Sequence, residues 1–316
     1  MTLILTIYCA VTAALAFALM AAAGIGEAAR RRREQWGNAV RGEYLRLVLL
    51  ALAEGDTDGA SGRFPGIGRV GARHALAEVL SRLAASTYGL DNRPLRRIVR
   101  ENGLESYLLR RIRRTRGYRR AYYLLLLSRL PLEAQTDAAV ARHTASRNPY
   151  VSFYALMTRL AFDPTMALRL VGEFARPFTV YEVSEVMATL RRGVLPVAYE
   201  PLLDSSDRNL RIVGLNIVRQ FGIEEAERQL LGIVRNGPQE LAREAVYTLC
   251  ALHRPLARRE VADFVRGMNA ADRKALLRSM AREGYSARAV GALSPEPERA
   301  YYRSLVDSYK CRIVCC

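Results

Sequence analysis

The first pattern in the chain is a long run of apolar positions at its N-terminus. Residues 1–26 contain no charged side chain, and the run is apolar apart from a few threonine, tyrosine and cysteine positions. A helix needs about 20 apolar residues to cross the hydrocarbon layer of a bilayer. A buried helix of a soluble domain rarely stays apolar on every side for so long. The pattern therefore predicts a transmembrane anchor within residues 1–29.

The charges around this run favour an uncleaved anchor over a secretory signal peptide. Ala21-Ala22-Ala23 is similar to a cleavage site, but a signal peptide also has basic residues before its apolar core, and none stands there. Four arginines follow the run instead: Arg30, Arg31, Arg32 and Arg33. They predict a single-pass protein with its N-terminus outside and the bulk of the chain cytoplasmic. Such a cluster is also adequate for binding anionic lipid.

Beyond the anchor the apolar periodicity becomes helical. Residues 30–54 predict a juxtamembrane helix, in which Trp36 and Tyr44 either lie near lipid headgroups or begin the first soluble helix. Residues 55–70, rich in Gly, Asp and Ser, predict a flexible linker and a domain boundary. From residue 71 to 309, helical patterns alternate with Pro, Gly, Asn and Asp, and no run alternates as a strand does. We therefore predict an all-α domain over 71–309 and a cysteine-containing tail over 310–316.

An internal repeat is visible in the second half of the chain. Four positions fall at helical spacing, and a shift of 31 residues leads to four more: Leu210, Gly214, Val218 and Phe221, then Leu241, Ala245, Leu249 and Leu252. Between them Ala226, Leu230 and Ile233 line one face of another helix. The repeating unit is thus a pair of antiparallel helices, each with one apolar stripe. Because neither helix can bury its stripe alone, the units are expected to stack into an α-solenoid.

The segment from Pro201 to Leu215 resembles a HEAT repeat, with an acidic turn and a Leu210-Arg211 pair that opens the second helix. The next unit is similar, but Pro238 replaces the turn aspartate and Ala242 replaces the arginine. The segment 148–155 reads as a degenerate copy. The resemblance covers about residues 195–253. It implies an α-solenoid used mostly for protein–protein contact, and it implies no reaction.

The charge of the chain adds information about its partners, because the formal net charge of the 316 residues is +17. A strongly basic surface points to anionic partners: nucleic acid, acidic lipid or an acidic protein. The densest basic run and its flanking tyrosines are Arg110, Arg111, Arg113, Arg114, Arg116, Arg119 and Arg120, with Tyr107 and Tyr118. Arginine with tyrosine suits phosphate contact and stacking on single-stranded nucleic acid, and it suits acidic headgroups or an acidic protein face equally well. A solvated helix face is the plainer alternative.

Candidate chemistry is sparse. The segment 66–71 matches G-x-G-x-x-G, but no strand is expected before it, so a dinucleotide site is not predicted. Anion binding there, helped by Arg63, Arg69 and Arg73, is the alternative to a plain linker. The histidines are scattered, and no cysteine pattern fits structural zinc or a disulfide framework. The terminal Cys315-Cys316 resembles a prenylation signal of Rab-type GTPases, but nothing else resembles a GTPase. We predict no catalytic residue, no cofactor and no metal.

These observations lead to a functional expectation. We expect a non-enzymatic, membrane-anchored scaffold or adaptor that faces the cytosol and binds a membrane-associated protein. By analogy with anchored HEAT proteins of bacteria, that partner is an envelope enzyme such as a glycosyltransferase. The alternative is a basic solenoid that binds nucleic acid, as the HEAT-like alkylpurine DNA glycosylases do. An enzyme with an unrecognised site is the third hypothesis, which a deep polar pocket would favour.

Overall fold

The computed structural model describes residues 34–53, 64–69, 71–86, 92–131, 135–163, 166–192 and 198–314, together with Met20. Helices are the only regular elements in this part of the chain, which confirms the predicted all-α class. The predicted anchor, apart from Met20, and Arg30–Arg33 lie outside the described residues. No helix within the described ranges combines the length and apolarity that crossing a membrane requires. The chain forms two compact units, residues 1–162 and 163–316, which are described separately.

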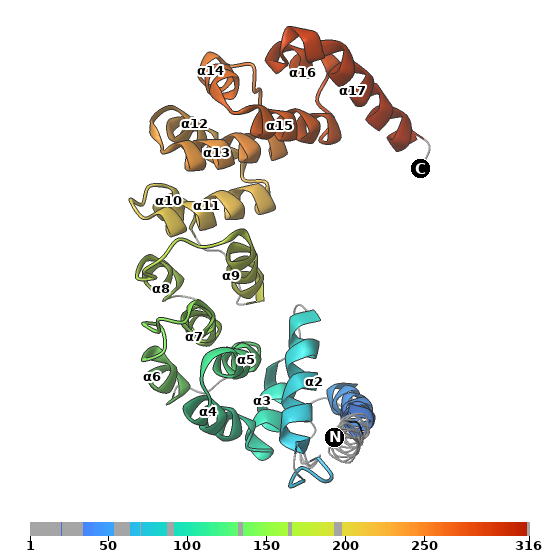
Figure 1. The fold of residues 1–316 in the computed structure, drawn as a ribbon, viewed down its shortest axis with the longest axis vertical. Coiled ribbons are helices and arrows are strands. Elements are labelled where there is room, and N and C mark those ends of the chain that lie inside the picture. The colour runs from blue at the N-terminus through green and yellow to red at the C-terminus, as the bar shows by residue number, and fades with distance from the viewer. Residues whose placement is uncertain are drawn as a thin grey trace, which may run out of the picture. The chain divides into compact units, whose positions relative to one another are not determined.

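In unit 1 the described residues include a helical segment over 34–53, which six further helices follow (Figure 1). Their bounds are α2 Ala72–Ser86, α3 Asn92–Glu101, α4 Leu104–Arg114, α5 Gly117–Ser128, α6 Gln135–Ala141 and α7 Pro149–Phe162. Helix α5 is central, since α2, α4 and α7 all pack against it. The fully buried Leu76, Leu108 and Leu124 come from three of these helices, and burying each leucine contributes about 1.5–3 kcal/mol.

The end of the predicted linker packs against this core. Among the residues described there, Phe64 is buried, its ring meets that of Tyr44 edge-on, and its N–H donates to the Asn102 side chain (3.1 Å). Residues 65–69 form a turn ahead of α2, and no strand occurs in the described residues that precede it, which are 34–53 and Phe64. Residues 54–63 lie outside the described part. The chain divides into its two compact units after Phe162.

Unit 2 is built from alternating helices in two layers. The bounds are α8 Ala167–Gly172, α9 Val180–Arg192, α10 Glu200–Leu203, α11 Arg208–Phe221, α12 Glu227–Asn236, α13 Gln239–Ala251, α14 Arg259–Gly267, α15 Ala270–Arg282, α16 Ala287–Leu293 and α17 Arg299–Val314. Helices α9, α11, α13, α15 and α17 pack in succession, and α12, α14 and α16 pack on one another beside them. From α11 onward, each helix therefore contacts a helix two places along the chain, as stacked helix pairs require.

Helices α11 and α13 begin 31 residues apart, which is the predicted spacing. The four predicted positions from Leu241 to Leu252 are buried, as are Gly214 and Val218 of α11, while Leu210 is half-buried. Phe221 differs, because it is the last residue of α11 and 49% of it is exposed. Gly222 follows it with φ of 65° and ends the helix, so the chain turns away before Phe221 reaches the core.

The turn before α11 shows why its sequence specifies a helix pair. The Asp207 carboxylate accepts from the Leu210 N–H (2.9 Å) and so caps the helix. The Arg211 Nε donates to the Leu203 carbonyl (3.2 Å) at the end of α10. A Cβ on Gly214 would lie 2.9 Å from the Leu202 Cβ, so the two helices touch backbone to backbone there. The acidic turn, the arginine and the glycine therefore have structural roles.

Candidate interaction surface

The predicted arginines gather around the turn between α4 and α5. Arg110, Arg111, Arg113 and Arg114 end α4, Arg116 precedes α5, and Arg119 and Arg120 lie in its first turn. Arg120 is half-buried, and its Nε donates to the carbonyls of Ile112 (3.1 Å) and Thr115 (2.9 Å). The other six are exposed. Arg120 therefore holds the turn together, and the rest face solvent.

Arg111 and Tyr107 form a local pair on α4. The Arg111 Nε donates to the Tyr107 hydroxyl (3.3 Å), and the guanidinium carbon lies 5.4 Å from the centre of the Tyr107 ring. This hydrogen bond raises the pKa of Arg111 above its already high value. The pair fixes the side chain of Arg111 against its own helix, so Arg111 is less free than the other exposed arginines to reach a partner.

Tyr118 has a partner that sequence reasoning did not single out. Its ring lies 5.0 Å from that of Tyr150, with 36° between the two planes. Tyr118 is 70% exposed and Tyr150 48% exposed. Each is the second residue of its helix, α5 and α7, and these helices pack side by side. The spacing of one repeat between the two tyrosines was the signal in the sequence that could have revealed the pair.

The exposed arginines around the α4–α5 turn differ from the arginines of unit 2 in whether they form ion pairs with acidic side chains. Unit 2 joins its helices by ion pairs, such as Arg235–Glu260 (2.8 Å), Arg254–Glu227 (2.5 Å) and Arg208–Glu240. Within the part of the chain that the structure describes, no ion pair involves Arg110, Arg113, Arg114, Arg116 or Arg119. No aspartate or glutamate occurs between residues 106 and 132. The charge of this turn is therefore uncompensated locally.

The same contrast holds for the whole sequence. Residues 1–162 contain 25 basic and 12 acidic side chains, whereas residues 163–316 contain 23 and 19. Most of the excess positive charge thus belongs to unit 1. A solvated helix face alone does not require such segregation, whereas an anionic partner is attracted by it.

A buried acid stands in this basic unit. Glu78 of α2 is 8% exposed, accepts from the Arg41 Nε (2.5 Å) and the Tyr122 hydroxyl, and lies 3.5 Å from the His74 Nε2. Burial alone would raise the pKa of Glu78, but the hydrogen bonds from Tyr122 and Arg41 lower it below its usual value. Burial lowers the pKa of His74 and raises that of Tyr122. The cluster joins segment 34–53, α2 and α5.

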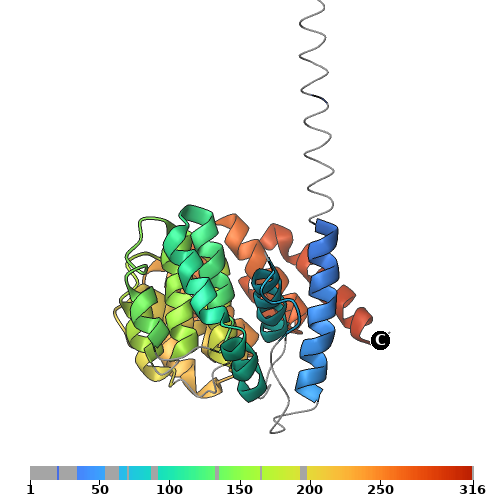
Figure 2. The same cartoon turned by 90° about the horizontal axis from the view of Figure 1, so that it is seen from below.

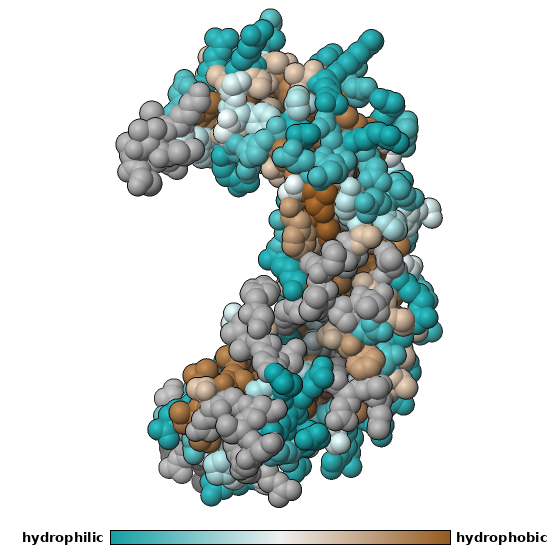
Figure 3. Space-filling model, turned by 180° about the vertical axis from the view of Figure 1, so that it is seen from behind, coloured by the Kyte–Doolittle hydropathy of each residue, from teal (hydrophilic) through white to brown (hydrophobic). Residues whose placement is uncertain are grey.

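An exposed apolar patch lies on segment 34–53. Tyr44 and Val48 are buried on one side of this helix, while Leu45, Leu49 and Leu50 are 42%, 49% and 48% exposed. Figure 3 shows hydrophobic surface at the end of unit 1 where this segment lies. We call these three residues the leucine patch. Exposed apolar side chains that gather on one surface are typical of contacts with another protein.

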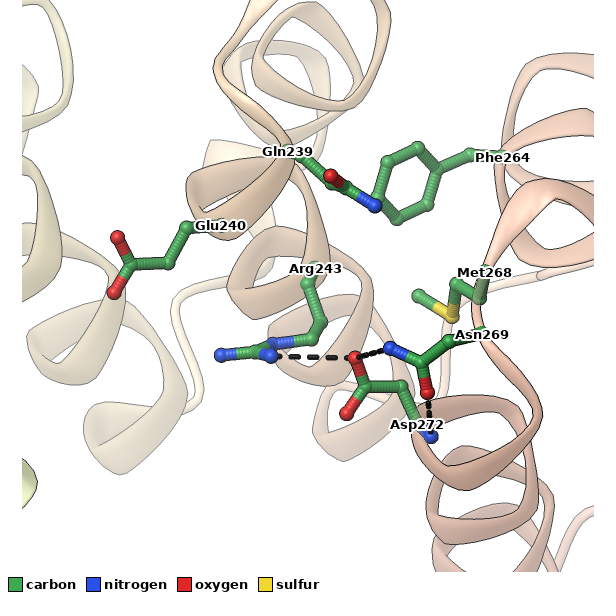
Figure 4. Close-up of a pocket in the computed structure, with 7 residues that line it drawn as sticks. All are labelled: Gln239, Glu240, Arg243, Phe264, Met268, Asn269 and Asp272. Atoms are coloured by element: carbon green, nitrogen blue, oxygen red, sulfur yellow. Dashed lines mark hydrogen bonds and ion pairs between the residues drawn. The ribbon is translucent and has the colours of Figure 1, made fainter.

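A small groove in unit 2 lies between α13, α14 and α15 (Figure 4). Its volume is about 200 Å³, and it is lined by Gln239, Glu240, Arg243, Phe264, Met268, Asn269 and Asp272. Asp272 pairs with Arg243 (3.3 Å) and accepts from the Asn269 side-chain amide (2.7 Å). Its polar groups thus satisfy one another, and ligand pockets usually reach about 300–1,000 Å³. The groove is therefore a weak candidate for a substrate site.

Reactive groups are not gathered into a site in the described ranges. No three metal-ligating side chains lie together there. Cys250 is fully buried, and burial raises the pKa of its thiol to about 12, so it is a poor nucleophile. The side chains of the terminal cysteines lie outside the described part. Comparison of the chain with protein-family models, curated proteins and solved structures gives no match.

Proposed function

We propose that this chain is a non-enzymatic, membrane-anchored HEAT-like scaffold that faces the cytosol and binds a membrane-associated protein. The observation that carries the proposal is the leucine patch, where Leu45, Leu49 and Leu50 are exposed on segment 34–53. The stacked helix pairs supply an extended scaffold, and the capped turn at Asp207 with Arg211 supports the resemblance to HEAT repeats. The leucine patch supplies a surface of the kind that proteins recognise.

The proposed membrane anchor brings the scaffold close to partners in the same membrane. Tethering confines the scaffold and its partner to two dimensions, which raises their effective concentration for each other. A protein in or on the same membrane is therefore the favoured partner, and an envelope enzyme such as a glycosyltransferase fits this description. The apolar run of residues 1–26 and the arginines that follow it are the sequence features behind this part of the proposal.

The test is an in-cell pull-down of the full chain after mild detergent extraction and nuclease treatment, analysed by mass spectrometry. It is compared with a chain that lacks residues 1–29 and with a Leu45→Ser, Leu49→Ser variant. We expect one membrane protein to be recovered with the full chain and lost from both comparisons. Recovery of the same proteins by all three chains would contradict the proposal.

Nucleic-acid binding is the second candidate, which the exposed arginines of α4 and α5 favour, because no ion pair within the described residues involves five of them. A parallel extraction without nuclease tests it. Nucleic acid that co-purifies with the full chain and with the chain lacking residues 1–29, is released by salt, and comes without a protein partner would replace the scaffold by this function.

A further inference from the structure

Two turns of unit 1 lie at the same end of that unit. Because the rings of Tyr118 and Tyr150 touch, the N-terminal ends of α5 and α7 lie together. The α4–α5 turn brings Arg113, Arg114, Arg116 and Arg119 to this end, and the α6–α7 turn brings the exposed Arg142 and Arg147. Neither residues 106–132 nor residues 138–162 contain an aspartate or glutamate. We call this the arginine–tyrosine end.

The arginine–tyrosine end lies on the side of unit 1 where segment 34–53 begins. Figure 2 shows the green α4–α5 turn and the residue-34 end of the blue segment at the same side of the unit. Glu78 holds the two in register, since it binds Arg41 of the segment and Tyr122 of α5. Trp36, the one tryptophan in the sequence, lies in the first turn of the segment and is 40% exposed.

We propose that the arginine–tyrosine end docks on the phosphate headgroups of an anionic phospholipid surface. This inference rests on the proposed anchor, because the segment that follows the anchor in sequence begins at this side of unit 1. Arginine forms charge-assisted hydrogen bonds to phosphate, and the amphipathic rings of tyrosine and tryptophan favour the interface between headgroups and water.

Lipid fits this surface better than nucleic acid does. The two tyrosine rings are only 5.0 Å apart, which is too close to admit a base between them. They already cover part of each other's faces, so they offer edges and hydroxyl groups to the surroundings. A broad array of arginines on two neighbouring turns matches a planar layer of phosphates, each arginine strengthening the attraction while it stays within a Debye length of the surface.

The experiment inserts the full chain into lipid nanodiscs and follows hydrogen exchange by mass spectrometry. One set of discs is made of phosphatidylcholine alone, and the other also contains phosphatidylserine. We expect the backbone amides of residues 107–120 and 142–150 to exchange at least about tenfold more slowly in the anionic discs. Raising the salt concentration should reverse most of this protection.

Variants assign the protection to named side chains. Replacing Arg113, Arg114, Arg116 and Arg119 by glutamine should abolish it, while replacing the same four by lysine should preserve most of it. A matched control removes four exposed arginines of unit 2 by Arg→Gln at positions 235, 259, 266 and 282, and it should leave the protection unchanged.

Three other outcomes are informative. If the chain inserts but the amides of the α4–α5 and α6–α7 turns exchange at the same rate in the two kinds of disc, the lipid-docking proposal is wrong. The proposal of a membrane anchor is then still supported by the insertion. If a single-stranded oligonucleotide protects the turns and anionic lipid does not, nucleic acid takes the place of lipid. If the chain inserts into neither kind of disc, the proposal of a membrane anchor is wrong. Co-flotation with anionic vesicles that depends on the four arginines would then support the docking surface, and its absence would overturn it.

Discussion

Some arginines of unit 1 form ion pairs between its helices, and others are exposed to solvent. Arg41 forms an ion pair with the buried Glu78, and Arg159 forms one with Asp137 (2.7 Å). Arg113 and Arg116 have no acidic neighbour in their own turn and face solvent. The same residue type therefore joins helices at some positions and is exposed to solvent, without an acidic neighbour, at others.

The joint at Glu78 can be tested by one substitution. Glu78→Gln keeps the shape but removes the charge that Arg41 and Tyr122 bind, so we expect unit 1 to lose about 1–3 kcal/mol of unfolding free energy. Glu43 is an exposed acid on the same segment as Arg41 and provides the control. The substitution Glu43→Gln should change the unfolding free energy by less than about 0.5 kcal/mol. Urea unfolding followed by circular dichroism measures both. Equal effects would show that the buried carboxylate does not hold the helices.

The same cluster predicts how stability depends on pH. Burial holds the pKa of His74 below its ordinary 6.5, so the neutral form is the one that the folded state prefers. Its stabilising effect is complete above pH 6.5 and is lost as the pH falls from there through the lower folded pKa. Burial also lowers the pKa of His143, which acts in the same direction. Glu78 contributes only further down, because its pKa lies below 4.5.

We therefore expect the melting temperature to fall between pH 7 and pH 5. His74→Gln, which stays neutral throughout, should make this slope shallower, and the further change His143→Gln should flatten it more. Thermal unfolding at a series of pH values tests this. A slope that neither substitution changes would place the titrating groups elsewhere.

At the scale of elements, glycine decides how closely α10 and α11 approach. A Cβ on Gly214 would meet the Leu202 Cβ at 2.9 Å and the Leu203 backbone nitrogen at 3.3 Å. Ala245 takes the equivalent position in α13 and is fully buried. The glycine is thus a local requirement of the α10–α11 contact rather than of the helix pair in general.

Gly214→Ala should destabilise unit 2 by about 1–3 kcal/mol, because the helices must move apart. Gly232 of α12 offers a matched comparison, since a Cβ there would meet no atom within 4 Å. Gly232→Ala should stabilise the helix by about 0.5–1 kcal/mol, as alanine loses less backbone entropy on folding. Thermal denaturation distinguishes the two. A neutral Gly214→Ala variant would mean that the helices can separate at little cost.

At the scale of the whole molecule, the two compact units should respond to mutation separately. Glu78→Gln should speed hydrogen exchange in α2 and α5 and leave α11 and α13 unchanged, and Gly214→Ala should do the reverse. The two effects should add in the double variant. Exchange measured by mass spectrometry on the three full-length proteins tests this. Faster exchange in both units from either substitution would show that they unfold as one.

The fold was predictable because it follows from local rules. The period of the apolar positions places helices along the chain, and the shift from Leu210 to Leu241 reveals their pairing. The same reasoning expected Phe221 in the stripe, because periodicity does not show that Gly222 ends the helix there. Composition likewise does not show that Phe64, at the end of the predicted linker, packs against Tyr44 and Asn102.

The sequence by itself determined the helical class, the spacing of the helix pairs, the apolar N-terminal run and the basic run with its tyrosines. These depend on residues close together in the chain. Only the tertiary structure decided which arginines are paired, that Tyr118 meets Tyr150, and that Glu78 joins Arg41 to Tyr122. These contacts span 32, 37 and 44 residues. They depend on which helices pack together, and a periodic pattern read along the chain does not contain that information.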